Sequence, residues 1–215
     1  MSRVVEIDPT RLCRWLETFT TRHGPVTTRL EPLDSPNAAG SRLVVEAADG
    51  ARARITAPFA PPAGGDLASF VDAVAVPRTV AALLVRRGGV AVGVFHGRDL
   101  VVSKIETAYV QGRTKAGGWS QQRYARRRVN QARQLIETAA ELVVTIVLPR
   151  RDALDLLATG GDRASVEEVL TDPRLGPLRD LRLDRVHPVP DPRLPVLRRF
   201  PDQYLALQIE LNDLA

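Results

Sequence analysis

The residues best suited to chemistry in this chain are two glutamines that follow a pair of glycines. The order is Gly117, Gly118, Trp119, Ser120, Gln121, Gln122. Glycine permits a positive φ and lets the backbone approach another molecule without a Cβ in the way. The glutamine side chain is a neutral amide that donates and accepts hydrogen bonds, so it can orient a water molecule without titrating. By composition alone, an ordinary turn before a helix is the simpler interpretation of a glycine pair.

Positive charge is concentrated around this segment. Residues 107–136 contain no Asp or Glu, whereas their seven cations are Arg113, Lys115, Arg123, Arg126, Arg127, Arg128 and Arg133. Removing these seven charges from the net charge of +5 leaves −2 for the rest of the chain. A localised positive field attracts polyanions and binds phosphates through counterion release, so RNA is a candidate partner. The alternative is a solvated basic helix face in a chain whose cations are nearly all Arg.

A long helix is predicted after the glycines, from about Gln122 to Glu141. We expect it to bury one apolar stripe on a sheet; the stripe is Ala125, Val129, Ala132, Ile136, Ala139 and Ala140. Arg123 and Arg127 lie on the opposite face and Arg126 and Arg133 to one side, where guanidinium groups can bind phosphates bidentately. Arg128 falls near the edge of the stripe, where a structural role is the alternative.

Residues 1–60 are predicted to form a small α+β unit. Asp8-Pro9 is a favourable helix start, and Gly24 ends that helix. Two β-rich stretches, 42–47 and 51–56, flank Asp49-Gly50, which suits a hairpin turn. Residues 61–78 are predicted to be a linker with a short helix.

Residues 79–215 are predicted to form the larger unit. The pattern from Thr79 is a three-stranded meander, then a glycine-bearing loop over 111–120 and the long helix. The segments expected after it are a buried strand at 142–149, helices at 151–158 and 165–170, and strands at 181–186 and 204–211. The fold class is therefore α+β, with a mixed sheet covered by helices.

The sequence GGWSQQRYARRR resembles the segment of archaeal and eukaryotic class-1 release factors around their Gly-Gly-Gln motif. There the motif is followed by Ser, two variable residues and Arg-aromatic-Ala-Arg-x-Arg. The residues in step are Gly117, Gly118, Ser120, Arg123, Tyr124, Ala125, Arg126 and Arg128. Trp119 occupies the place of the release-factor glutamine, and Gln121 comes two residues later. This Gly-x-x-Gln form resembles the Vms-type release-factor-like domain of eukaryotic ribosome-quality-control hydrolases, which is a stand-alone protein in actinobacteria.

The resemblance implies a release-factor catalytic domain with an RNase-H-like architecture. It also implies hydrolysis of the peptide–tRNA ester in the peptidyl-transferase centre of the large ribosomal subunit, in rescue of stalled ribosomes. The partners would be 23S rRNA and peptidyl-tRNA. Gln121 is the expected catalytic residue and Gln122 the alternative, with Gly117, Gly118, Trp119 and Ser120 positioning the loop. The expected RNA-binding residues are Arg113, Lys115, Arg123, Arg126, Arg127 and Arg133. Trp119 either stacks on a base or seats the loop on its own helix.

Other functions have less support in the residues. A metal-dependent nuclease on an RNase-H-like sheet needs converging carboxylates, and only Asp99 and Glu106 are near the central strands. A tRNA-acting nuclease that cleaves near the acceptor end without a metal is a further alternative. A non-catalytic RNA- or ribosome-binding module remains an alternative, because Trp119 replaces the usual glutamine. One cysteine and three scattered histidines predict neither a disulfide nor a metal site. With no apolar run long enough for a membrane span and no signal sequence at its start, the chain is expected to be a cytoplasmic monomer without a cofactor.

Overall fold

The computed structural model describes residues 3–33, 41–59, 65–107 and 119–215, and the side chains of the long helix from residue 129 onward. The chain divides into two compact units, residues 1–76 with 201–215, and residues 77–200. Each unit contains a five-stranded sheet with helices packed on it. The fold is therefore mixed α+β, as the sequence predicts.

The first unit is built on an antiparallel sheet. Its strands, in spatial order, are β1 (Arg3–Ile7), β10 (Leu207–Leu211), β4 (Arg52–Thr56), β3 (Ser41–Ala47) and β2 (Val26–Pro32). The helical segments of this unit are η1 (Pro9–Arg11), α1 (Leu12–His23), α2 (Leu67–Ala75) and α6 (Pro201–Tyr204). Leu12 and Phe19 of α1 and Phe70 of α2 contribute large buried side chains to its core.

Local signals explain the start of this unit. The Asp8 carboxylate accepts a hydrogen bond from the Thr10 backbone N–H at 2.9 Å, which caps η1, and α1 ends before Gly24, whose φ is +84°. Gly50 has a φ of +88° in the turn between β3 and β4. The predicted helix and hairpin are therefore confirmed. Strands β1 and β2 were not predicted.

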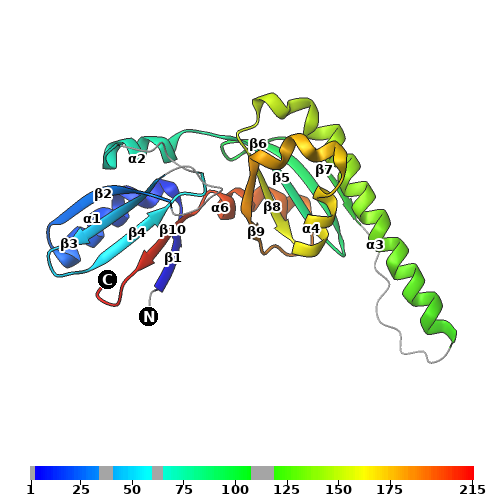
Figure 1. Cartoon of the computed structure of the whole chain (residues 1–215), viewed down its shortest axis with the longest axis horizontal. Coiled ribbons are helices and arrows are strands. Elements are labelled where there is room, and N and C mark those ends of the chain that lie inside the picture. Colours follow the sequence, from blue (N-terminus) through cyan, green and yellow to red (C-terminus); the bar gives the residue numbers. More distant parts are fainter. Residues whose placement is uncertain (1–2, 34–40, 60–64, 108–118) are drawn as a thin grey trace. The chain divides into compact units, whose positions relative to one another are not determined.

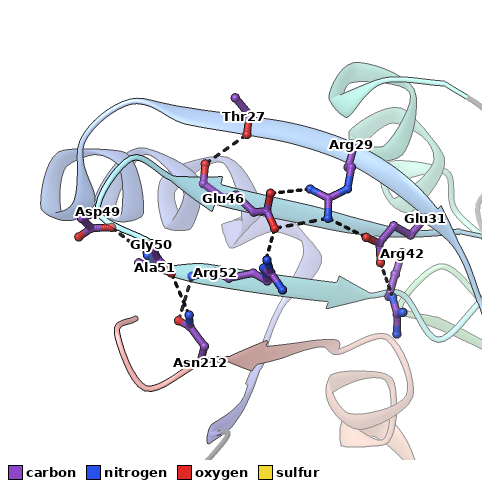
Figure 2. A network of polar contacts seen from close by, with 10 residues as sticks. All are labelled: Thr27, Arg29, Glu31, Arg42, Glu46, Asp49, Gly50, Ala51, Arg52 and Asn212. Carbon is purple, nitrogen blue, oxygen red and sulfur yellow. Dashed lines mark hydrogen bonds and ion pairs between the residues drawn. The ribbon is translucent and has the colours of Figure 1, made fainter.

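A network of ion pairs crosses strands β2, β3 and β4 (Figure 2). The Glu46 carboxylate accepts from Arg29 Nη1 at 2.7 Å and lies 2.6 Å from Arg52 Nε. Arg29 also donates to Glu31, at 2.8 Å. Asn212 extends the network, because it accepts from the Arg52 backbone N–H and donates to a turn carbonyl. The hydrogen bond from Arg29 is the main reason that the pKa of Glu46 lies below its ordinary value.

The second unit is built on a mixed sheet. Its strands, in spatial order, are β7 (Asp99–Thr107), β6 (Gly89–His96), β5 (Thr79–Arg86), β8 (Leu156–Gly161) and β9 (Arg182–His187). β5, β6 and β7 are antiparallel, and β8 and β9 are parallel to β5. The helical segments are α3 (Trp119–Ile146), η2 (Leu148–Ala153), α4 (Arg163–Leu170), η3 (Pro173–Leu181) and α5 (Leu194–Arg199). The predicted meander is confirmed, as are the segments near 165–170 and 181–186.

The predicted strand at 142–149 is wrong. α3 continues to Ile146, and Val143, Ile146 and Val147 are buried at helical spacing. An unbroken apolar run fits a buried strand and a buried helix equally well, so periodicity does not separate them. The predicted helix at 151–158 is also wrong. The helical residues end at Ala153, and strand β8 begins at Leu156.

The strand predicted at 204–211 belongs to the first sheet, and not to the unit predicted over residues 79–215. β10 pairs with β1 on one side and β4 on the other, which places Leu207 and Ile209 in the first unit's core. A single strand carries no sequence signal for the sheet it joins, since any antiparallel neighbour with an apolar face satisfies it. The contiguous range 79–215 is therefore not what the structure places in one unit.

Candidate functional site

The first half of α3 extends beyond the sheet on which its second half packs (Figure 1). The helix has 28 residues, which span about 42 Å, whereas the longest strand beneath it has nine residues, or roughly 30 Å. Every described side chain from Val129 to Gln134 is exposed, and Ala139 is the first that is fully buried. We refer to residues 119–134 as the arm; its backbone spans about 24 Å.

The arm corrects the predicted buried stripe. Val129 is 66% exposed, Ala132 is exposed and Ile136 is half-buried. Only Ala139 and Ala140 are buried, while the side chain of Ala125 lies outside the described set. The sequence does contain a signal that the first part of the stripe is exposed, because large aliphatic side chains begin only at Leu135. Before that residue the stripe offers alanines and one valine, which bury little apolar area.

Ion pairs and backbone capping fix the packed half of α3, from which the arm extends. Arg174 of η3 donates to Glu141 of α3 and to Asp172, in both cases at 2.8 Å. Its hydrogen bonds to these two carboxylates raise the pKa of Arg174, and Arg174 in turn lowers the pKa of Asp172. Arg150 Nη1 donates to the Ile146 carbonyl at 2.7 Å, which satisfies an otherwise free acceptor at the end of α3. This anchor could not be predicted from the sequence, since Glu141 and Arg174 are far apart in the chain.

Some of the predicted loop and catalytic residues lie outside the described residues, and the others lie in the first turn of α3. Gly117, Gly118, Arg113 and Lys115 lie outside the described residues, as does most of the loop 111–120. Trp119, Ser120, Gln121 and Gln122 form the first turn of α3, so the helix begins earlier than predicted. Nothing is described of their side chains, nor of those of Arg123, Arg126 and Arg127.

The outer end of the arm is electropositive for reasons that need no side chain. The first four N–H groups of a helix have no partner within the helix, and the aligned peptide dipoles place about half a positive charge there. The first turn of α3 contains no acidic residue to offset this charge. The end of the arm therefore favours a phosphate or a developing oxyanion.

Arg133 is the one predicted RNA-binding residue whose side chain is described. Its Nε donates to Glu137 Oε1 at 3.0 Å, and the two side chains are 79% and 64% exposed. An exposed pair at this spacing is worth only about 0.3–0.5 kcal/mol, so a phosphate can replace Glu137 as its partner. A role for Arg133 in RNA binding stays a prediction.

The described residues do not assemble a second chemical site of the kinds considered. Asp99 and Glu106 lie at opposite ends of β7, and Glu106 is 3.5 Å from Lys104. Among the described residues, no three His, Cys, Asp or Glu side chains are grouped as metal ligands. Within the same part of the chain, no helix is long and apolar enough to cross a membrane.

The arm and its sheet fall within a region that matches a known family. The sequence model of the Actinobacteria/chloroflexi VLRF1 release factor matches residues 78–210. The chain belongs to this family. The match covers more than half of the chain, includes the whole of α3 and its glutamines, and spans residues 78–200 of the second unit together with 201–210 of the first.

Solved structures offer more distant similarities to this VLRF1 family member. The crystal structure of archaeal translation termination factor aRF1 aligns with a TM-score of 0.44 and 13% identity, over 89% of this chain and 68% of that one. A structure titled an archaeal protein aligns with a TM-score of 0.38 and 15% identity, over 91% of this chain and 70% of that one. No curated protein matches the chain.

Proposed function

We propose that this release-factor family member hydrolyses the ester bond between a nascent peptide and tRNA on the large ribosomal subunit, in the rescue of stalled ribosomes. The observation that carries the proposal is that Gln121 belongs to the first turn of α3, at the outer end of an arm about 24 Å long. A reaction site enclosed by RNA is reached only by a structure that extends beyond the body of its protein. Membership of the release factor family supports the same conclusion.

In the proposed reaction, a water oxygen bonds to the ester carbonyl carbon and the bond from that carbon to the tRNA ribose oxygen breaks. The water's proton ends on the ribose oxygen, so the products are a free peptide carboxyl group and an intact tRNA hydroxyl. We assign to the Gln121 amide the orientation of the water, a contribution of geometry more than of acid–base strength. The ribosome supplies 23S rRNA and the tRNA ribose around it. No step requires a metal or cofactor, and the protein acts in the cytoplasm as a monomer.

The test compares Gln121→Ala with Gln122→Ala and Trp119→Ala. Purified large subunits carrying peptidyl-tRNA are mixed with saturating protein, and free peptide and intact tRNA are measured in a single turnover. Gln121→Ala is expected to slow release by about a hundredfold or more, the effect of losing one well-placed hydrogen-bonding group in an active site. Gln122→Ala should act much less, and Trp119→Ala mainly on affinity.

Stability separates a chemical effect from misfolding. A residue in the first turn of a projecting helix should change the free energy of unfolding by no more than roughly 0.5 kcal/mol when truncated. If Gln122→Ala is the inactive variant, the register of the motif is wrong by one residue. If all three variants release peptide at the wild-type rate, the proposed mechanism is refuted. If the tRNA itself is found cleaved, a nuclease activity replaces the proposed ester hydrolysis.

A further inference from the structure

Three exposed arginines lie where β5, β8 and β9 end, at the edge of the second sheet from which the arm projects. Arg87 follows β5, Arg163 follows β8, and Arg193 follows the segment that leaves β9. The arm projects from this end of the sheet. Its strand neighbour β7 ends there, at Thr107 opposite Gly89. The buried end of α3 lies at the other end, because it leads to Asp155, which accepts a hydrogen bond from Thr79 at the start of β5. We call these three residues the basal rim.

Close backbone contacts hold the three segments together. Gly161 at the end of β8 has a φ of +107°, and a Cβ there would lie 2.0 Å from the Val85 carbonyl oxygen of β5. The Asp162 backbone N–H donates to the same carbonyl at 2.9 Å. β8 therefore turns into α4 directly beside the β5–β6 hairpin, which brings Arg163 to the hairpin that carries Arg87.

The third segment is fixed to the same hairpin. Arg86 Nη1 donates to the Val189 carbonyl at 2.8 Å, and its Nε lies 3.8 Å from Asp191. A Cβ on Gly88 would lie 2.9 Å from the Asp191 carboxyl, so the segment after β9 lies against the hairpin. Arg193 follows two residues later. The rim is thus built on rigid backbone, although its members are far apart in the sequence.

The acidic residues at this edge already have partners. Asp191 faces Arg86, and Glu106 faces Lys104 at 3.5 Å. Asp162 caps α4, where it accepts from the Ala164 backbone N–H at 3.2 Å. By contrast, among the described residues no acidic side chain lies within ion-pair distance of the three rim arginines. Glu167, one turn after Arg163, is stabilised by the charge of Arg163 but forms its hydrogen bonds with Arg182. The edge therefore carries surplus positive charge of the kind that binds phosphate.

We propose that Arg87, Arg163 and Arg193 bind the phosphodiester backbone of large-subunit RNA at the base of the arm. The inference rests on the proposed function, because its partner is the RNA into which the arm extends. The described part of the acid-free segment, residues 119–136 of α3, extends from the same end of the sheet, so one polyanion can contact the rim and the arm together. The rim lies at the sheet end from which the arm of about 24 Å extends, and we assign to it the point at which the body of the protein stops against the RNA.

The test measures binding of the full chain to isolated large ribosomal subunits and to protein-free large-subunit RNA. The variant is Arg87→Gln with Arg163→Gln and Arg193→Gln, while Arg86 stays in place because it holds Val189. The control is Arg11→Gln with Arg14→Gln and Arg22→Gln, three exposed arginines in the first unit whose side chains have no ion pair within the described residues. Both triple variants remove the same charge, and thermal unfolding checks that both are folded.

Each phosphate contact contributes about 0.7–0.9 to the slope of log affinity against log salt. The rim variant should therefore lose about 2 to 3 in slope between about 50 and 200 mM salt, and bind about five- to eightfold more weakly for each contact at 0.1 M. The control should keep nearly the wild-type slope. An unchanged slope in the rim variant, or an equal loss in the control, would overturn the proposal. So would a loss with intact subunits only, which would point to an acidic protein surface.

Peptide release by the wild-type chain separates this inference from the proposed function. A chain that binds RNA through the rim but releases no peptide would refute the hydrolysis and leave the contact standing. A chain that releases peptide, with a salt slope indifferent to the rim, would refute the contact alone. A wild-type chain that binds neither subunits nor their RNA would refute both.

Discussion

Changing the length of the arm is the most direct test of how this protein works. Seven helix-forming residues inserted between Gln131 and Ala132 would lengthen α3 by about 10.5 Å and turn its outer end by only about 20°. Five residues would lengthen it by about 7.5 Å and turn its outer end by about 140°. The first insertion changes the distance of Gln121 from the body of the protein but hardly changes the direction in which it faces. The second insertion changes both the distance and the direction.

Both insertions should leave the fold intact, because the described side chains around the insertion point are exposed. Peptide release should fall by about a hundredfold or more in each, since a displacement of even 1 Å costs about that much at a reacting centre. The control is Gln131→Ala with Gln134→Ala, which alters the same surface without changing its length. Single-turnover release and the thermal unfolding midpoint are measured for all three. Wild-type release from the longer insertion would show that the arm is not a fixed spacer.

Two further predictions concern stability. Gly161→Ala should lower the free energy of unfolding in urea by at least about 2–3 kcal/mol, from its positive φ and from a Cβ only 2.0 Å from the Val85 carbonyl oxygen. Gly176→Ala, which meets nothing within 4 Å, should change it by roughly 0.5 kcal/mol or less, and equal effects would contradict the argument. Because the pKa of Glu46 is lowered in the folded state, its contribution should be complete above the ordinary glutamate pKa of about 4.3 and be lost as the pH falls through the lower folded value. Urea unfolding of wild type and Glu46→Gln across that range should show a shallower acid loss in the variant, and identical slopes would refute it.

Much of the fold was predictable where local chemistry decides the structure. Asp8-Pro9, Gly24 and Asp49-Gly50 act within a few residues of themselves, and each predicts its cap or turn correctly. The prediction for the apolar run 142–149 was wrong because a segment buried on all sides has no hydrophobic periodicity that distinguishes a helix from a strand. β10 was misplaced for a different reason, since the choice of a sheet depends on neighbours that the strand's own residues do not specify.

The candidate site was predictable as a motif but not as a shape. The order of Gly117, Gly118 and Gln121 depends only on sequence, so the resemblance could be found without coordinates. The arm depends on where the sheet stops, which is set by the lengths of other elements. The basal rim could not have been predicted, because the segments that carry Arg87, Arg163 and Arg193 come to one end of the sheet only through the parallel pairing of β5 with β8 and the contacts of Asp191.

The position of β10 also governs the order in which the chain can fold during its own synthesis. Among the described strands, β1 pairs with β10 alone, and β10 lies between β1 and β4 in the first sheet. Strands β2 to β4 can form a meander early, but β1 has no edge to join until residues 207–211 have been translated. The second unit is encoded wholly within that interval, so it can be complete while the first is still open. Of the described strands, β1 is made first and waits longest for its partner, which exposes it to mispairing in a newly made chain.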